Sequence, residues 1–426
     1  MRERLVDERG AAPAQAFGQT VAVEIAPQPT LAVGRLGFVD SLRALAALYV
    51  VGDHITSAVW SHSHVAGSLS SILTPLTYGH FAVSVFIVLS GFSLMLPVAR
   101  RGNNMPWSVL SFYWRRARRI LPPYYLALAL SLLLIWLFMS QQTGPNWDVS
   151  LPITTRDVVE HLLLAQDFTS RSASVNYAFW SIAMECQIYL LFPALVLLFR
   201  RYPTLVATGA IAILSIVALY ALLPTWLGHL PGYETAAFAP QYVGLFGMGM
   251  FGGVMAVAPS RHWVALRDRS LWEGVAALGC GLFIALINTW PPYALDFCLA
   301  IGTVGLLLAA ARPSRRNPLR VALEWRPLVW IGGFSYSIYL IHAPLIHLLW
   351  QYGLRPLGLA MGTLPTYLAL LVVGLPLIVA ASWLFWWGCE RPFLNSRPLG
   401  WRSTTQAQAS AQASAFADVR AHDKTR

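Results

Sequence analysis

The stretch that decides the fold is FVDSLRALAALYVVGDHI, residues 38–55, an apolar segment that carries an arginine and a histidine. Eleven steps of roughly 100° separate Arg43 from His54, about three helical turns, so a helix would present both side chains on one face. Ionisable side chains at membrane depth usually face a protein interior or a wet cavity. From this segment alone, His54 could instead be a structural residue that only forms a hydrogen bond to a neighbouring helix.

The composition predicts an all-α fold, a polytopic bundle of membrane helices. Of the 426 residues, 56% are hydrophobic and 12% are charged, whereas soluble domains have about 25% charged residues. Apolar runs of about 20 residues recur along almost the whole chain, unlike the short alternating segments of a membrane β-barrel. The net charge of +11 does not indicate nucleic-acid binding, because the basic residues are spread over many short loops. The cysteines lack metal-ligand spacing, so no metal site is expected.

The hydropathy pattern predicts about ten spanning helices, each with boundaries uncertain by a few residues. They cover residues 38–57, 76–98, 120–139, 177–199, 203–223, 239–257, 271–289, 294–311, 328–350 and 364–388. The chain then divides into a cytoplasmic segment 1–37, a membrane domain 38–393 and a polar tail 394–426 that we expect to be disordered.

The basic residues predict the orientation of the bundle. With the N-terminus inside, 26 of the 30 Lys and Arg residues fall on inner segments, and only Arg156, Arg171 and Arg355 fall on outer ones. By the positive-inside rule, this predicts that both termini lie in the cytoplasm. The longest outer connection, 140–176, contains a stretch with a helical pattern, TTRDVVEHLLLAQ.

Two glycine-containing stretches lie inside predicted spans. In VFIVLSGFSLML, Ser90 and Gly91 interrupt a run of bulky residues, which favours close helix packing, although Ser90 is also a candidate ligand for a polar substrate. GMGMFG at 247–252 formally matches the GxGxxG dinucleotide pattern. Because no strand precedes it and it lies in an apolar span, we interpret it as a packing surface.

A dense arginine cluster precedes the third predicted span, in FYWRRARRILPPYY. Arg115 shares a helical face with Arg118, and Arg116 shares one with Arg119. Pro122 and Pro123 are then expected to fix the angle at which this span enters the membrane. The cluster fits either contact with anionic lipid or a phosphate clamp, because arginine forks match phosphate oxygens.

Two further spans carry polar side chains. In FWSIAMECQIYLLFP, we expect Glu185 to be buried inside the membrane, where it is either a functional-site residue or a structural partner of an arginine or histidine. In IGGFSYSIYLIHAPLI, Tyr336, Tyr339 and His342 form a stripe that fits either hydrogen bonding between helices or catalysis. The candidate substrate-binding residues are Ser90, Trp180, Ser181, Tyr336, Tyr339 and His342.

Five stretches, in this order, resemble the acyltransferase-3 family of integral membrane O-acyltransferases. They are SLRALAALYVVGDH, VFIVLSGF, FYWRRARRILPPYYL, FWSIAMECQIYLLFP and FSYSIYLIHAP, followed by CERPF at 389–393. The resemblance spans roughly residues 38–393. It implies transfer of an acyl group, which we expect to be acetyl, from an acyl-CoA donor to a hydroxyl of a carbohydrate, with no tightly bound cofactor. The resemblance also implies a place in a bacterial inner membrane. It also implies that Arg43 and His54 are the hallmark pair, and Cys186 stands where many members have a second acidic residue.

These residues agree with that chemistry. A sugar hydroxyl needs a general base to attack a thioester, and His54 has the appropriate intrinsic pKa. The catalytic candidates are His54, Arg43 and Glu185. Arg115, Arg116, Arg118 and Arg119 would bind the polyanionic acyl-CoA, and direct transfer and a His54 acyl intermediate both stay open. The expected partners are acyl-CoA, a carbohydrate or lipid-linked glycan acceptor and the lipid bilayer. The competing class is a transporter or flippase, which would not need the arginine cluster.

Overall fold

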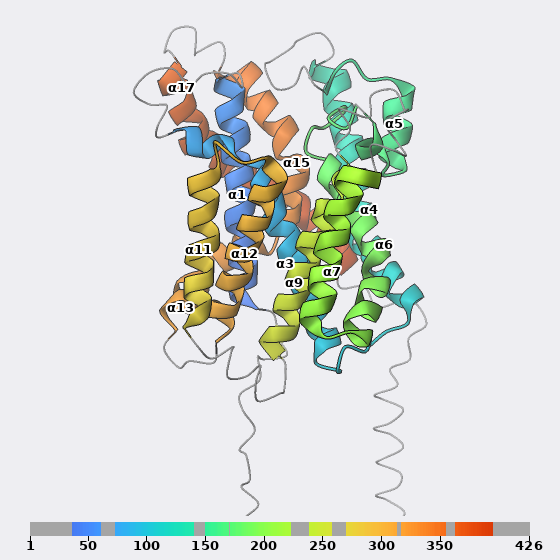
Figure 1. The fold of residues 1–426 in the computed structure, drawn as a ribbon. Coiled ribbons are helices and arrows are strands. Elements are labelled where there is room, and N and C mark those ends of the chain that lie inside the picture. Colours follow the sequence, from blue (N-terminus) through green and yellow to red (C-terminus); the bar gives the residue numbers. More distant parts are fainter. Residues whose placement is uncertain are drawn as a thin grey trace, which may run out of the picture.

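The computed structural model describes residues 36–60, 73–139, 150–169, 171–222, 238–257, 270–312, 317–354 and 363–394. Within these ranges the regular structure is entirely helical, which confirms the predicted all-α class (Figure 1). The predicted cytoplasmic segment and polar tail lie almost wholly outside the described residues.

Each of the ten predicted spans overlaps at least one helix, and the last two are divided among several helical segments. The principal helices are α1 (Gly37–Val59), α3 (His80–Ala99), α4 (Val109–Leu134), α6 (Trp180–Arg201), α7 (Thr204–Val217), α9 (Gln241–Val257), α11 (Leu271–Leu286), α12 (Pro292–Ala311), α15 (Ser335–Leu348) and α18 (Leu375–Phe385). The shorter helices are η1 (Thr74–Thr77), η2 (Ile135–Met139), α5 (Thr155–Leu162), η4 (Gln166–Phe168), η5 (Ala218–Leu222), α13 (Pro318–Leu323), α14 (Arg326–Gly332), η7 (Leu349–Leu354), α17 (Thr363–Ala369), η8 (Leu370–Gly374), η9 (Trp386–Glu390) and α19 (Arg391–Leu394).

Fewer helices are long and apolar enough to cross a membrane than the sequence predicted. Among the described residues, six helices are long and apolar enough to cross a membrane. The count is seven when α14 and α15, which are bent by 73° relative to each other, form one span. The helices α9 and α11 are apolar but have only 17 and 16 residues. The chain is therefore a multi-pass membrane protein, and the predicted count of about ten is not confirmed.

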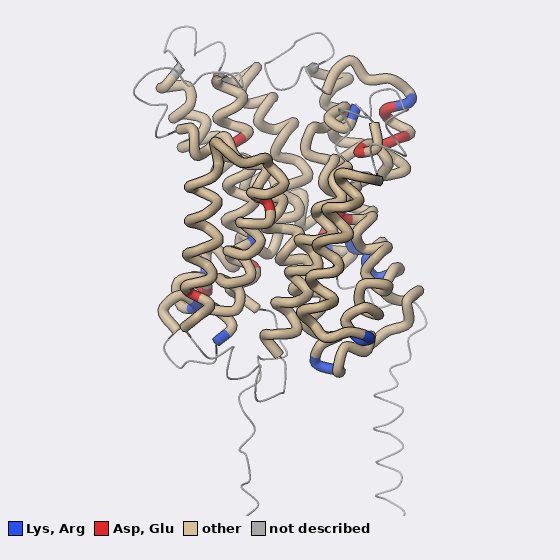
Figure 2. Tube along the Cα trace, in the orientation of Figure 1, with Lys and Arg blue, Asp and Glu red and all other residues tan. Residues whose placement is uncertain are grey.

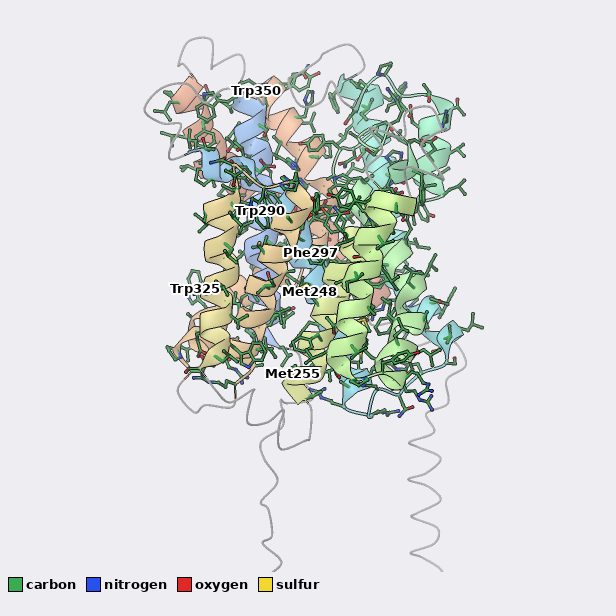
Figure 3. All side chains as sticks on the ribbon, viewed as in Figure 1. Met248, Met255, Trp290, Phe297, Trp325 and Trp350 are labelled. Carbon is green, nitrogen blue, oxygen red and sulfur yellow. The ribbon has the colours of Figure 1, made fainter. Side chains whose placement is uncertain are left out.

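The helices stand side by side between two ends of the bundle (Figure 1). We call the end where α1 begins, the lower end in Figure 1, the N-terminal side, and the end that carries α5 the loop side. Figure 2 shows basic residues of the described part gathered mainly toward the N-terminal side. In Figure 3, Trp350 lies at the loop side and Met255 at the N-terminal side. The helices α1 and α15 run toward the loop side, and α3 and α6 run back.

Glycines bring α3 and α9 into backbone contact. A Cβ atom added at Gly91 would lie 2.2 Å from the carbonyl oxygen of Phe246, and one at Gly249 would lie 2.2 Å from that of Val88. No side chain fits at either position without moving a helix. The prediction that the 247–252 glycines form a packing surface is confirmed.

The helix α4 differs from its predicted start. It begins at Val109, after Ser108, whose hydroxyl accepts a hydrogen bond from the backbone N–H of Ser111 at 3.2 Å. Pro122 and Pro123 lie inside the helix and not at its start, and their effect on its angle of entry stays a prediction. Membrane helices accommodate proline because neighbouring groups can satisfy the carbonyls that it frees. The arginine cluster is therefore part of the helix.

The helical pattern predicted in the connection 140–176 is confirmed by α5. Thr154 caps this helix, and its backbone N–H donates to Asp157 Oδ2 at 2.7 Å. The Arg171 side chain donates to both carboxylate oxygens, at 3.0 and 3.1 Å. Burial alone would raise the pKa of Asp157, but the hydrogen bonds from Arg171 and Thr154 outweigh it and lower that pKa to about 2.

Candidate functional site

A cavity of about 230 Å³ lies among α1, α3, α4, α6 and α15. It gathers eight of the residues predicted from the sequence. Four are charged, namely Arg43, Arg116, Arg119 and Glu185. Four carry hydroxyl groups, namely Ser90, Ser181, Tyr336 and Tyr339. Residues from five helices therefore meet in one volume, as a substrate site requires.

The cavity is electropositive at the end nearer the N-terminal side. Arg43 leaves α1 there, and its Nη2 donates to the hydroxyl of Ser93 on α3 at 3.0 Å. Its Nη1 lies 3.7 Å from a carboxylate oxygen of Asp40. Three arginines line the cavity against one glutamate, so the lining favours an anionic ligand.

The four arginines of α4 divide by helix face. Arg116 and Arg119 line the cavity, whereas Arg115 and Arg118 do not. The Arg115 guanidinium lies over the Trp107 ring, 4.4 Å from its centroid. Within the described residues, Arg116 Nε is buried without a hydrogen-bond partner, as are Arg115 Nη2 and Arg118 Nε. An unpaired guanidinium N–H beside a cavity fits an anion with several acceptor oxygens.

Glu185 is fixed at mid-cavity by two hydroxyl groups. Ser90 donates to its Oε1 at 2.8 Å, and Tyr189 donates to the same oxygen. The hydroxyl oxygens of Ser90 and Tyr189 are 2.5 Å apart. The sequence analysis missed Tyr189 and Ser93. Tyr189 lies four residues after Glu185, and Ser93 lies three residues after Ser90, so helical spacing could have identified both.

An aromatic and hydroxyl layer lines the opposite end of the cavity. The hydroxyl oxygens of Ser181 and Tyr339 are 2.5 Å apart, and the Phe86 ring meets the Tyr339 ring edge-on at 6.0 Å between centroids. One turn nearer the N-terminal side, Tyr336 donates to the carbonyl oxygen of Ile120 at 3.1 Å. The cavity therefore changes along its axis from arginines to hydroxyl groups.

His54 and His342 lie beyond this layer and form a pair. His54 Nδ1 is 2.8 Å from His342 Nε2. The pair does not line the cavity, so Arg43 and His54 share a helix but not this volume. His342 follows Tyr339 by three residues on α15, which places the pair about one turn beyond the hydroxyl layer.

The contacts of His342 determine the hydrogen positions in the pair. Its Nδ1 lies 3.0 Å from the carbonyl oxygen of Ile338 and 2.8 Å from that of Tyr339. Carbonyl oxygens only accept, so Nδ1 of His342 carries the proton. In a neutral His342, Nε2 then accepts from Nδ1–H of His54. In this assignment Nε2 of His54 carries no hydrogen, so it can accept a proton.

Asp53 lies close to that nitrogen, and the sequence analysis missed it. Its Oδ2 lies 3.7 Å from His54 Nε2. Asp53 is almost fully buried against Gly79, where an added Cβ atom would come within 2.5 Å of the same carboxylate oxygen. A carboxylate at this distance can stabilise the imidazolium that forms when His54 takes a proton.

Besides the histidine pair, Arg115 and Arg118, one more predicted site residue, Trp180, lies outside the cavity lining. The Trp180 ring packs 6.0 Å from the Tyr242 ring. Cys186 is a partly buried free thiol directly after Glu185, and it does not line the cavity either. Glu185 is accordingly the one carboxylate among the lining residues.

Comparison with known proteins gives one family. Residues 36–387 match the model of a family described as an acyltransferase domain. The chain is 27% identical to the acyltransferase MdmB of Streptomyces mycarofaciens over 351 residues, which are 78% of this chain and 83% of that protein. No solved structure matches the chain.

Two further relatives are longer proteins. The chain is 23% identical to the peptidoglycan O-acetyltransferase OatA of Listeria monocytogenes over 336 residues, which are 73% of this chain and 49% of OatA. It is 26% identical to the putative peptidoglycan O-acetyltransferase YrhL of Bacillus subtilis over 327 residues, which are 72% of this chain and 48% of YrhL. The chain spans about half the length of these two relatives.

The family match extends from α1 to η9 and includes every residue that lines the cavity. It also includes both histidines of the pair. The chain belongs to the acyltransferase-3 family of integral membrane acyltransferases.

Proposed function

We propose that this acyltransferase moves an acetyl group from a coenzyme A thioester to a hydroxyl group of a carbohydrate. The observation that carries the proposal is the cavity that joins three arginines to a hydroxyl-lined end, one helical turn from a histidine pair. The names of the longer relatives support an acetyl group and a glycan acceptor. We extend the proposal to a glycan at the cell surface, either polymeric or lipid-linked.

The donor occupies the arginine end of the cavity. Coenzyme A is a polyanion, and Arg43, Arg116 and Arg119 supply guanidinium forks for its phosphate oxygens. The Nε–H group of Arg116 is buried without a hydrogen-bond partner within the described residues, so it can donate to a phosphate oxygen of the donor substrate. The pantetheine arm would run along the cavity past Glu185 and bring the thioester to the Ser181 and Tyr339 hydroxyls.

His54 acts as the general base in this scheme. The acceptor O–H gives its proton to Nε2 of His54, and its oxygen attacks the thioester carbonyl carbon. The tetrahedral intermediate then re-forms the carbonyl and breaks the C–S bond. The departing thiolate takes the proton back from the imidazolium, so the products are the ester and free coenzyme A. His342 holds His54 in the required tautomer, and the Asp53 carboxylate stabilises the imidazolium.

The orientation follows from where the donor is made. Acyl-CoA is a cytoplasmic metabolite, so the arginine end of the cavity would face the cytoplasm. The basic residues on the N-terminal side fit this orientation under the positive-inside rule. The loop side would then face outward in a bacterial inner membrane, and the acceptor would approach His54 from there.

The test uses membranes that contain the full chain and acetyl-CoA labelled in the acetyl group. We expect release of free coenzyme A together with label in an ester that hydroxylamine cleaves. Membranes with His54→Gln, at equal protein level, should show about 10²-fold less of both. Wild-type membranes that bind acetyl-CoA but never form a labelled ester would overturn the proposal, and glycan export without ester formation would favour a transporter.

A further inference from the structure

The end of the cavity away from the arginines contains two hydroxyl groups that take no part in phosphate binding or proton removal. Ser181 reaches this point from the first turn of α6, and Tyr339 reaches it from α15. Their oxygens are 2.5 Å apart, and both residues are almost fully buried, with 7% and 8% of their surfaces exposed. Two buried hydroxyls from separate helices thus converge on one point of the lining.

That point lies between the two substrates of the proposed reaction. The arginines are at the other end of the cavity, so a donor held there presents its thioester here. On the far side, His342 follows Tyr339 by three residues, and its Nδ1 donates a hydrogen bond to the backbone carbonyl oxygen of Tyr339 at 2.8 Å. A thioester carbonyl beside Tyr339 would therefore lie about one helical turn from the histidine pair.

The two hydroxyl hydrogens can be redirected at little cost. In the resting arrangement one hydroxyl donates to the other, and Ser181 Oγ also lies 3.5 Å from the carbonyl oxygen of Ala178, a long contact. Hydroxyl groups rotate about their C–O bonds, so both hydrogens can turn toward a third oxygen. The Phe86 ring packs edge-on against Tyr339 and limits movement of its ring.

We propose that Ser181 and Tyr339 are catalytic residues that donate hydrogen bonds to the oxyanion of the tetrahedral intermediate. This inference rests on the proposed acyl transfer. As the acceptor oxygen bonds to the thioester carbon, the carbonyl π electrons move onto its oxygen, and the two hydroxyls stabilise that negative charge. Neither hydroxyl gives up its proton. When the carbonyl re-forms and the C–S bond breaks, the two groups return to their mutual hydrogen bond.

The experiment removes each hydroxyl and keeps the shape of the side chain. Tyr339→Phe lacks only the phenolic oxygen, and Ser181→Val and Ser181→Thr have nearly equal volumes but differ in the hydroxyl. Initial rates of labelled acetyl transfer are measured across a range of acetyl-CoA concentrations. We expect kcat to fall by about 10²- to 10³-fold in Tyr339→Phe and Ser181→Val, the usual loss for one oxyanion donor. Ser181→Thr should recover most of the rate, and KM for acetyl-CoA should stay nearly constant.

Two matched variants remove hydroxyls elsewhere. Tyr125 donates to the carbonyl oxygen of Leu162 at 2.8 Å, and Ser382 donates to that of Ile378 at 2.7 Å; neither lines the cavity. Tyr125→Phe and Ser382→Ala should retain wild-type kcat. Wild-type kcat in Tyr339→Phe, or equal rates in Ser181→Thr and Ser181→Val, would overturn the oxyanion role and leave the proposed function standing. A rise in KM at constant kcat would also overturn it. A wild-type protein without acyl transfer would overturn both.

Discussion

The Nδ1 atom of His54 lies 2.8 Å from Nε2 of His342, and the second nitrogen of His342 is bonded to backbone carbonyls. His342 therefore has no nitrogen left for a substrate. The sequence analysis predicted His342 as a substrate-binding residue, and that role stays a prediction. Its contacts in the structure fit a residue that orients His54.

Replacing His342 should therefore reduce the rate less than replacing His54. We expect His342→Ala to lower acetyl transfer by about 10- to 100-fold, the usual scale for losing a group that orients a functional histidine. His342→Gln should recover part of this loss, because its amide oxygen can accept from His54. A His342→Ala enzyme that is less active than His54→Gln at equal protein level would make His342 the base.

Donor affinity should depend on which face of α4 carries the arginine. Replacing Arg116 or Arg119 by Ala should weaken acetyl-CoA binding about tenfold or more, since a hydrogen bond to a charged group contributes about 1.5 kcal/mol or more. The remaining binding should be less sensitive to salt. Equilibrium binding of labelled acetyl-CoA to the purified protein measures both effects.

The control for this measurement is Arg200→Ala with Arg201→Ala, in the last turn of α6 and outside the cavity lining. That variant should bind the donor like the wild type. If the Arg116 variant and the control lost equal donor affinity, the arginine cluster would act only through general electrostatic attraction. A larger loss of affinity in Arg115→Ala than in Arg116→Ala would lead to the same conclusion.

The glycine contact between α3 and α9 gives a stability prediction. Gly91→Ala and Gly249→Ala should each cost about 1–3 kcal/mol, because the new methyl group meets a backbone carbonyl that cannot rotate away. Gly209→Ala on α7 is the control, since its Cβ atom would meet nothing within 4 Å. Thermal unfolding in detergent ranks the three variants. A Gly91→Ala protein as stable as the control would contradict the close packing.

The stability of the loop-side helix α5 should depend on pH because of the Asp157 carboxylate. Its pKa in the folded protein, about 2, lies below the value of about 3.9 for an unfolded chain. The carboxylate therefore stabilises the fold above about pH 4, and this contribution is lost as the pH falls toward 2. Proteolysis of the 154–171 segment should become faster over that interval. In Asp157→Asn the segment should already be cleaved faster at pH 7, and cleavage that stays as slow as in the wild type would exclude a role for this ion pair.

Sequence patterns predicted helices better than they predicted membrane crossings. Apolar runs located α3, α6 and α12, because a long apolar helix has few alternatives in a bilayer. They could not show that α9 and α11 end after 17 and 16 residues. The start of α4 was misplaced because prolines suggested a boundary, whereas the Ser108 cap lies upstream in a stretch with no apolar pattern.

The sequence predicted which site residues lie together when they share a helix. It did not predict contacts between site residues on different helices. Helical spacing correctly paired Arg116 with Arg119, but only the packed rotation of α4 turns this pair inward and the pair Arg115 and Arg118 away. His54 and His342 are 288 positions apart, so no local pattern could join them. Their roles, like those of the cavity residues, stay predictions until the variants are measured.

The bend of 73° between α14 and α15 also affects the electrostatics of the cavity. Because the chain turns there, α15 begins within the bundle, and its first residues, Ser335 and Tyr336, line the same volume as the arginines. The first backbone N–H groups of a helix carry a partial positive charge that no proton loss can remove. The attraction of this volume for an anion should therefore persist at alkaline pH and survive, in weakened form, the removal of any single arginine.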